Sequence, residues 1–512
     1  MEFLDPSPDP ASDQLKAAQR APARTWNRML RNVFALGSSQ VLTMALHATA
    51  AVVVPRFLGD VNLGKLAFAS VYVSYFGLFI GLGVGTYLTK EVARNPSLAA
   101  HYAVNAALMR LPLVLVVSLL AIVSVNLLGY DAVTRQAVYL LLIGMFFGSM
   151  SAVVGGTLQG LQEMRGLAVA QVAIKVFSVT AVTAVLFTGH GILEVALVRS
   201  LSGGVGFMVT LFFLIRYTGL HFSPNLAMWR PLLLGGLPFF VWSASLLTYG
   251  KIDQLMLSAM TNDAVLGWYS MAHTLIAIDT FIPAIIMMVI FPALSAAAAK
   301  RNFHSFNSIA RRALQAVLLG SLPLAIGLIL LSGKLIDLLY PPEFEHAVPL
   351  VIIGALGMPL VAVDMILGTA LNARDKQRQW SFVAVGAAFL NPGMNAVLIP
   401  ITQSAYGNGA IGASIATVVT EVYMMVMALW LLPRDVFDRS TLSNALRTVA
   451  AGLIMAAAVL LVRDLFIVVP IAVGAVVYGA SCLLLRAFVL SDLWRLWLYF
   501  LERQGARAVS AG

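Results

Sequence analysis

The sequence has few charged residues and almost no cysteine. Only 11% of its 512 residues are Asp, Glu, Lys or Arg, and 60% are hydrophobic, whereas about a quarter of the residues in a soluble domain are charged. This shortage excludes an ordinary soluble fold, because a soluble fold could not bury so much apolar surface. The single cysteine, Cys482, excludes an intrachain disulfide and a cysteine-based metal cage.

The sequence also lacks the motifs of common enzyme and nucleotide-binding classes. Its seven histidines are scattered, no two of them have metal-ligand spacing within one predicted helix, and no Gly-rich phosphate loop of the Walker type occurs. We therefore expect no enzyme activity, no cofactor and no transport powered by ATP on this chain. The net charge of +10 does not indicate nucleic-acid binding, because the basic residues lie in short connections between apolar runs.

Long apolar runs are what the sequence has in abundance. Each run is about 20 residues long, which is the length of a membrane-spanning helix. The runs do not alternate apolar and polar residues as the strands of a membrane barrel do. We predict an all-α polytopic membrane protein with fourteen transmembrane helices. The last two are short and closely joined around Arg463 and Asp464, so one re-entrant hairpin is the alternative there. The predicted spans are 32–56, 65–88, 107–129, 136–159, 167–187, 192–215, 231–258, 264–292, 311–332, 347–372, 380–400, 410–432, 445–463 and 465–486.

The distribution of Lys and Arg predicts the orientation, because positive charge stays on the cytoplasmic side. With both termini inside, 25 of the 33 Lys and Arg residues fall in inside segments, 5 in outside segments and 3 within spans. Connections rich in Lys and Arg thus alternate with connections that have few, and one helix more or fewer would destroy this alternation. We therefore expect both termini on the cytoplasmic side of the inner or plasma membrane. Residues 1–26 are predicted to be a disordered tail, and residues 487–512 an amphipathic tail.

Three short motifs recur in the same order in the two halves of the chain. Residues 59–64 return 203 positions later at 262–267, Gly156-Thr157 returns 212 positions later, and Gly189-His190-Gly191 matches a motif 218 positions later. Six helices per repeat is an even number, so both halves enter the membrane in the same direction. Such a parallel repeat favours a transporter with two lobes around a central site. We predict lobes at 27–228 and 229–434, followed by two additional helices within 435–486.

The same stretches resemble the polysaccharide-repeat flippases of the multidrug/oligosaccharidyl-lipid/polysaccharide exporter superfamily. The likeness runs over roughly residues 27 to 432 and is carried by Pro55–Asp60, Gly81-Leu82-Gly83, Glu91–Arg94, Gly236-Leu237-Pro238, Gly267-Trp268-Tyr269 and Phe291–Leu294. It implies two six-helix lobes around a cavity and alternating access. The implied substrate is a polyprenyl-diphosphate-linked oligosaccharide, moved from the inner to the outer leaflet. Membrane lipids, a polysaccharide polymerase and glycosyltransferases are the implied partners.

Seven ionisable residues within the predicted spans are candidates for a functional site, because such a residue near a helix centre costs about 2.5–3.5 kcal/mol and therefore usually faces a cavity or a partner. For the diphosphate implied by the resemblance, the candidate ligands are the cations Lys175, Arg199 and Lys251. Arg56, at the outer end of the first hairpin, is a fourth candidate. The alternatives are that the three cations pair with nearby acids, as Lys251 with Asp253 or Asp279, and that Arg56 only anchors the interface.

Four acids in the spans are candidates for binding a coupling ion, H⁺ or Na⁺. Asp279 leads because it lies in mid-span beside Pro283, which we expect to bend the helix. Asp253, Glu421 and Asp364 are the other three, and a static ion pair is the alternative role.

We therefore predict a lipid-linked oligosaccharide flippase that works as an ion-coupled antiporter or on the membrane potential. Three alternatives remain open. They are an exporter of drugs or organic cations with the same fold, a membrane glycosyltransferase or polymerase acting on the same lipid, and a non-transporting scaffold.

Overall fold

The computed structural model describes residues 10–219 and 222–487, with side chains from residue 44 onward apart from Arg434. The first half forms α1 (Pro10–Gly81), α2 (Val84–Arg94), α3 (Ala99–Leu127), α4 (Ala132–Gly160), α5 (Met164–Phe187) and α6 (Ile192–Thr218). The second half forms α7 (Trp229–Met260), α8 (Asp263–Ile276), α9 (Phe281–Ala299), α10 (Phe303–Leu339), α11 (Val348–Ala373), α12 (Gln377–Tyr406) and α13 (Ala410–Leu431). Two further helices follow, α14 (Arg439–Val462) and α15 (Val468–Leu484). Part of the predicted tail at 1–26 lies outside the described residues. Almost all of the predicted tail at 487–512 does so as well.

Fourteen segments in this part of the chain suit membrane crossing. Twelve helical segments are long and apolar enough to cross a membrane. One of them, Met44–Gly81, changes direction at Gly59, whose φ of 73° and ψ of 175° are accessible essentially to glycine alone, and so contains two crossings. The shorter apolar helix α15 adds one more. The prediction of an all-α fold with fourteen crossings is confirmed, and α14 and α15 are two separate helices.

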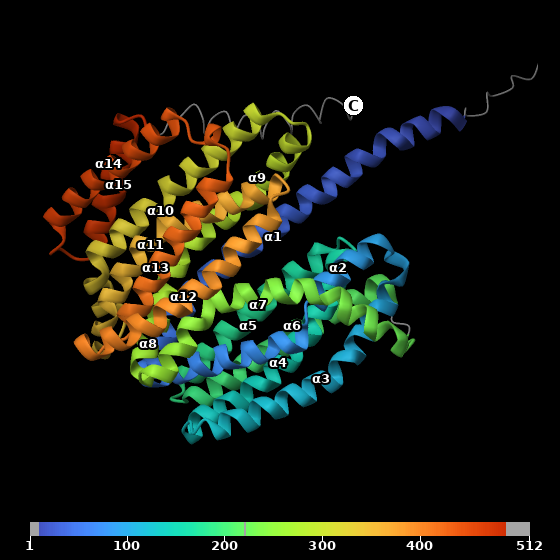
Figure 1. Ribbon diagram of the computed structural model, residues 1–512, viewed down its shortest axis with the longest axis horizontal. Helices are drawn as coiled ribbons and strands as arrows, with labels where there is room; N and C mark the ends of the chain where they lie inside the picture. The colour runs from blue at the N-terminus through green and yellow to red at the C-terminus, as the bar shows by residue number, and fades with distance from the viewer. Residues whose placement is uncertain (1–9, 220–221, 488–512) are drawn as a thin grey trace, which may run out of the picture.

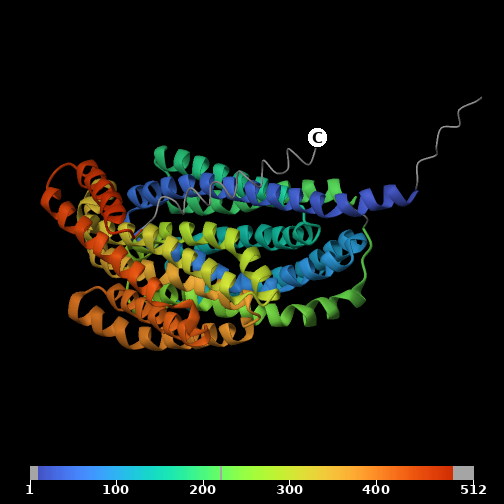
Figure 2. The ribbon, with the colours of Figure 1, turned by 90° about the horizontal axis from the view of Figure 1, so that it is seen from above.

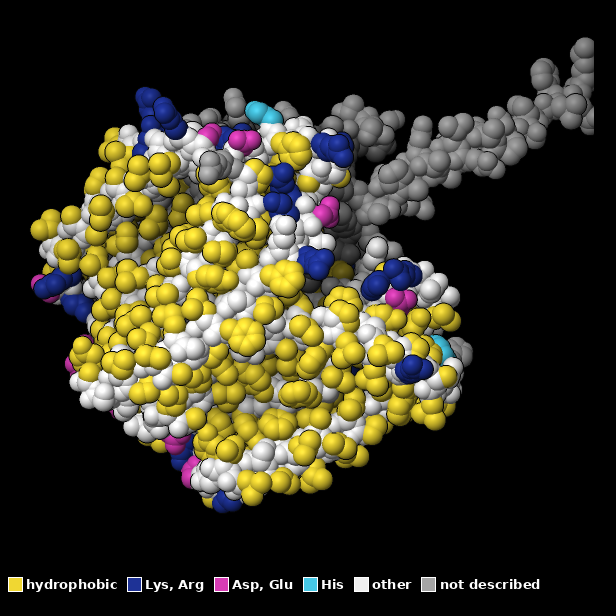
Figure 3. Space-filling view, in the orientation of Figure 1, with side chains coloured by type: hydrophobic (Ala, Val, Ile, Leu, Met, Phe, Trp, Pro, Cys, Tyr) yellow, Lys and Arg dark blue, Asp and Glu magenta, His cyan; other side chains and the backbone are white. Residues whose placement is uncertain are grey.

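The outside of the molecule has the composition of a membrane protein. Figure 3 shows hydrophobic side chains over most of the visible face, while Lys and Arg gather toward the ends of the helices. Leu115, Phe389 and Leu461 illustrate this surface, since 72%, 76% and 88% of their area is exposed. A soluble protein rarely exposes apolar patches of this extent. The chain is therefore a multi-pass membrane protein, and its orientation remains a prediction.

The first thirteen helices form two bundles that diverge from a common junction (Figure 1). In the N-terminal bundle, α1 to α6, α6 packs on α4 and α5, and α1 packs on the same two helices. In the C-terminal bundle, α7 to α13, α11 packs on α10 and α13, and α12 packs on α13 and α7. Helices α14 and α15 pack on each other and on α10, and Figures 1 and 2 both show them at the edge of the molecule.

The apolar cores show which ends of the bundles are joined. One continuous core contains residues of both halves, among them Leu58 and Leu66 from α1 and Leu266 and Tyr269 from α8. These residues belong to the ends that the Lys and Arg distribution places outside. At the opposite ends the two halves have largely separate cores, one around Phe306 and one built mainly by the N-terminal bundle. The bundles are thus joined at the predicted outer end, while at the other end the beginning of α7 packs on α2 and contributes Leu232 to the core of the N-terminal bundle.

An ion pair ties α10 to the beginning of α14 and gives the fold a testable dependence on pH. Asp438 accepts hydrogen bonds from Ser440 Oγ at 2.7 Å and from the Thr441 backbone N–H at 2.9 Å, and it pairs with Arg311. The hydrogen bond from Ser440, that from Thr441 and the charge of Arg311 together lower the pKa of the Asp438 carboxyl from 3.8 to about 2. A carboxylate with a lowered pKa stabilises the fold above its unfolded pKa, and this stabilisation is lost as the pH falls toward its folded pKa.

We therefore expect Asp438→Asn to lower the melting temperature of the detergent-solubilised protein at pH 7. The difference from the unsubstituted protein should shrink as the pH falls from about 4 to about 2. The exposed Asp464, in the connection between α14 and α15, supplies a matched control, because Asp464→Asn removes a carboxylate that caps no helix. A difference between Asp438→Asn and the unsubstituted protein that is independent of pH would contradict the assignment.

Candidate functional site

A group of basic side chains lies in the N-terminal bundle, and one of its members contacts α9 of the second half. Lys175 on α5 is within electrostatic range of Arg199 on α6 and of His47 on α1. Arg199 is exposed in the bare protein and donates from Nη1 to Ser70 Oγ at 3.4 Å. The His47 ring lies edge-on to Phe281, the first residue of α9, with ring centroids 6.4 Å apart. We call Lys175, Arg199 and His47 the basic group.

The basic group contains no acid. None of its members forms an ion pair within 4 Å with an Asp or Glu in the described part of the chain. Two cations held near each other in surroundings of low dielectric repel, and an anion bound between them removes that repulsion. The group is therefore suited to an anion with more than one negative charge. His47 was not predicted from the sequence, because a single histidine in an apolar run gives no signal until α1 packs on α5.

A second polar group lies inside the C-terminal bundle, around Asp253 of α7. This side chain is 4% exposed. Its carboxylate accepts from Tyr269 Oη at 2.7 Å, from Asn395 Nδ2 at 2.7 Å and from Thr417 Oγ1 at 3.0 Å. Asn395 Nδ2 also donates to Asn391 Oδ1 at 2.8 Å. Helices α8, α12 and α13 thus bring neutral hydrogen-bond donors to this carboxylate.

Lys251 does not pair with Asp253, although they are two residues apart on α7. Among the described residues Lys251 forms no ion pair within 4 Å with Asp253 or with Asp279. Residues two apart on a helix point in different directions, so the sequence neighbours do not face each other. The two charges are within electrostatic range of each other but are not in contact within 4 Å.

Asp253 borders a cavity of about 200 Å³ that is also lined by Asp279 and Glu421. Asp279 is 2% exposed and accepts from Ser321 Oγ at 2.8 Å, while its Oδ1 has no hydrogen-bond partner in the part of the protein described. Glu421 accepts from the hydroxyl of Tyr249. Three of the four predicted acids thus line one cavity.

The α-helical pattern is interrupted at Asp279, four residues before Pro283. Residues Ala277–Thr280 form a 3-10 turn between α8 and α9, and Asp279 lies in that turn. Pro283 falls in the first turn of α9, where the missing backbone N–H costs no hydrogen bond. The turn directs the Asp279 carboxylate toward α10.

Two predicted site residues lie apart from these groups. Asp364 on α11 is 7% exposed, does not line the cavity, and its Oδ1 has no hydrogen-bond partner among the described residues. Arg56 is exposed at the end of the first half of α1. Nothing in the geometry links Arg56 to the basic group.

At the junction of the two bundles, the repeated motifs contact each other reciprocally. A β-carbon placed on Gly64 would lie 1.8 Å from the carbonyl oxygen of Asp263. One placed on Gly267 would lie 2.0 Å from the carbonyl oxygen of Asp60. Both distances are far below van der Waals contact, so each backbone approaches the other closely only because both positions are glycine. We call this contact the glycine junction.

Polar contacts surround the glycine junction. Trp268 Nε1 donates to Asp60 Oδ2 at 2.9 Å, and the His346 ring packs on Trp268 with centroids 4.5 Å apart. The hydroxyls of Tyr130 and Ser258 lie 3.1 Å apart across the bundles. These contacts hold the predicted outer end closed.

Comparisons with known proteins agree with this architecture. The family model described as "Polysaccharide biosynthesis protein" matches residues 29–298. No curated protein sequence matches the chain. Among solved structures, the lipid II flippase MurJ in an inward closed conformation is 15% identical, with a TM-score of 0.72 over 89% of this chain and 99% of that chain.

Two further structures have the same fold. An inward-facing multidrug resistance MATE family transporter of the MOP superfamily is 16% identical, with a TM-score of 0.61 over 76% of this chain and 93% of that one. A MOP superfamily transporter from Pyrococcus furiosus is 15% identical, with a TM-score of 0.54 over 78% of this chain and 94% of that one. At these identities the likeness shows the fold of this chain.

Proposed function

Because the chain belongs to the polysaccharide biosynthesis protein family, we propose that it is a flippase for a polyprenyl-diphosphate-linked oligosaccharide. It carries this lipid from the inner to the outer leaflet by alternating access. The observation that carries the proposal is the basic group, which contacts α9 of the second half through one of its members and has no acidic partner among the described residues. The fold shared with the lipid II flippase MurJ supports it.

The chemistry of the basic group fits a diphosphate. A guanidinium binds two phosphate oxygens at once, and an ammonium adds a point charge with three donors. Arg199 and Lys175 supply one of each, and they come from neighbouring helices of one bundle. The diphosphate therefore binds to the N-terminal bundle, while its lipid chain remains in the bilayer.

The arrangement of the bundles supports entry from the cytoplasmic leaflet. The cores are joined at the predicted outer end, whereas at the other end only the beginning of α7 packs into the core of the N-terminal bundle and the core around Phe306 stands apart. Figure 3 shows a notch between the bundles with Lys and Arg side chains near its rim. Release to the outer leaflet then requires the glycine junction to part and the opposite ends to come together.

The acid-lined cavity of the C-terminal bundle supplies the coupling site in this proposal. Asp253, together with the oxygens of Asn391 and Thr417, offers oxygen ligands to Na⁺, and a proton is the alternative ion. Asp279 and Glu421 border the same cavity and can exchange a proton with it. Among the described residues no group of three or more His, Cys, Asp or Glu side chains is placed to hold a metal ion.

A translocation assay in proteoliposomes tests the function. The purified chain should move a labelled polyprenyl-diphosphate oligosaccharide between leaflets, and imposed pH or Na⁺ gradients should change the rate. Organic cations supplied instead should not be transported. Transport of organic cations without movement of the lipid-linked sugar would replace the flippase by a drug exporter of the same fold.

The coupling site makes a separate prediction. One charge moved through 100 mV is worth about 2.3 kcal/mol, or about a 50-fold change in rate. We expect Asp253→Asn to translocate the lipid in the absence of gradients but to lose most of this stimulation. Asp364→Asn, which removes a buried carboxylate outside the cavity, serves as the matched comparison. If Asp364→Asn loses the stimulation and Asp253→Asn retains it, the coupling site lies elsewhere.

A further inference from the structure

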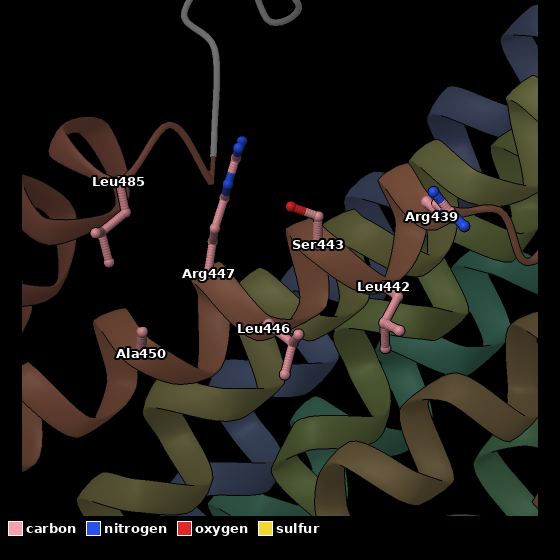
Figure 4. A pocket seen from close by; sticks show the side chains of 7 residues that line it. All are labelled: Arg439, Leu442, Ser443, Leu446, Arg447, Ala450 and Leu485. Carbon is pink, nitrogen blue, oxygen red and sulfur yellow. The ribbon is translucent and has the colours of Figure 1, made fainter.

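A groove at the beginning of α14 lies outside both bundles. Its volume is about 400 Å³, and all of its lining comes from α14 and from Leu485 at the end of α15. Figure 4 shows Leu485 facing the Ala450 side of α14 across the groove. The lining residues are Arg439, Leu442, Ser443, Leu446, Arg447, Ala450 and Leu485.

Two arginines and a serine follow one face of α14 along this groove. Arg439, Ser443 and Arg447 are spaced by four residues, which places them on one face of the helix. Eight residues at 1.5 Å each separate the two arginines by about 12 Å along the axis. Figure 4 shows the side chains of Ser443 and Arg447 extending to the same side of the helix.

These cations have no acidic partner in the described part of the chain. Neither Arg439 nor Arg447 forms an ion pair within 4 Å there, and Arg447 Nη1 donates to the backbone oxygen of Arg486 at 3.4 Å. That contact joins the Arg447 side chain to the backbone that follows α15. The adjacent carboxylate, Asp438, is occupied by Arg311. The groove is therefore a site of uncompensated positive charge.

The neighbouring face of α14 is apolar and exposed. Leu442 and Leu446 are 64% and 60% exposed, and further along the helix Leu453 and Leu461 are 64% and 88% exposed. In a bilayer this stripe lies against acyl chains, while the arginines at the helix end reach the headgroup level. The surface therefore places cations next to an apolar stripe. This arrangement complements a phospholipid, whose charged phosphate is followed by apolar acyl chains.

We propose that this groove binds an anionic phospholipid, with its phosphate between Arg439 and Arg447 and its acyl chains along Leu442 and Leu446. The transport substrate is not the occupant, because neither bundle contributes a lining residue. The site is thus independent of the transported lipid, and it anchors α14 and α15 in one leaflet.

The first test removes the charges and measures lipid binding to the full chain. Arg439→Gln/Arg447→Gln should bind phosphatidylglycerol about 30-fold more weakly, because each of the two basic residues near a membrane surface contributes about 1 kcal/mol to binding anionic lipid. Phosphatidylcholine binding should not change. Arg463→Gln removes a cation from the opposite end of the same helix pair and should leave both affinities unchanged. Equal phosphatidylglycerol affinity in the double variant and the unsubstituted chain would overturn the proposal.

The second test leaves the arginines in place and reports proximity. With Cys482→Ser removing the only native cysteine, Ser443→Cys carries a fluorophore. Brominated phosphatidylglycerol should quench it several-fold more than brominated phosphatidylcholine at the same mole fraction, and high salt should reduce the difference. A fluorophore at Leu461→Cys, on the same helix far from the groove, should be quenched equally by both. Equal quenching at position 443, or displacement of phosphatidylglycerol by a polyprenyl diphosphate, would overturn the assignment.

Discussion

Replacing Lys175 and Arg199 together by alanine reduces translocation of the lipid-linked oligosaccharide by about 10²- to 10⁴-fold. The reason is that each cation donates charge-assisted hydrogen bonds worth about 1.5–3 kcal/mol to the bound diphosphate. Two such losses add to about 3–6 kcal/mol, and each 1.36 kcal/mol corresponds to a factor of ten in rate. Folding should not suffer, because neither side chain forms an ion pair within the described structure.

The measurement is the rate of lipid movement per reconstituted molecule, alongside export of a surface glycan in cells. Lys300→Ala/Arg301→Ala is the matched control, because it removes one Lys and one Arg that are exposed at the end of α9. Lys251→Ala tests whether the C-terminal bundle adds a third cation to the site. Normal translocation by the Lys175→Ala/Arg199→Ala variant would refute the role of the basic group in substrate binding.

Much of the fold could be predicted because the membrane simplifies the problem. A span must be apolar over about 20 residues. Loops rich in Lys and Arg stay on the cytoplasmic side when the chain is inserted, independently of how the helices later pack. Both signals are local in sequence, so fourteen crossings could be counted before any contact was known. The weak repeat between residues 59–64 and 262–267 also corresponds to a structural feature, because its two copies contact each other at the glycine junction.

The site was less predictable because its partners come from distant parts of the chain. Asp253 was predicted to be functional as a carboxylate in mid-membrane, but its donors lie on α8, α12 and α13. His47 joined the basic group only through the packing of α1 on α5. The role of Lys251 stays a prediction, because Asp253 lies within electrostatic range of it but forms no contact with it within 4 Å. The sequence thus identifies the ionisable residues, because a charge in the membrane is costly. Their partners are identified only by the packing of the helices in the structure.

The surroundings of Asp279 show the same limit at a smaller scale. Proline was the only local signal for an irregularity in this span, at Pro283. The 3-10 turn at Ala277–Thr280 has no such signal in the sequence. That turn places Asp279 against Ser321 of α10, a contact between helices.

Gly64→Ala/Gly267→Ala forces the glycine junction apart and shifts the protein away from its closed outer end. Each added methyl group would lie 2.0 Å or less from a backbone carbonyl oxygen, which has no rotamer by which to move away. Extra methyl groups in a packed interior cost about 1–3 kcal/mol each. The pair therefore costs about 2–6 kcal/mol in the closed state alone, and about 5.5 kcal/mol changes a ratio of 99:1 to 1:99.

Spin labels on either side of the junction measure this shift. With Cys482→Ser as background, Val61→Cys and Glu345→Cys place labels on two exposed positions, one from each half of the chain. Their distance distribution should move to longer values in the Gly64→Ala/Gly267→Ala protein. Gly148→Ala/Gly333→Ala adds the same two methyl groups to helical glycines with no atom within 4 Å, and should leave the distribution unchanged. If both pairs of substitutions gave the same distribution, the two copies of the repeat would meet without controlling access to the outer leaflet.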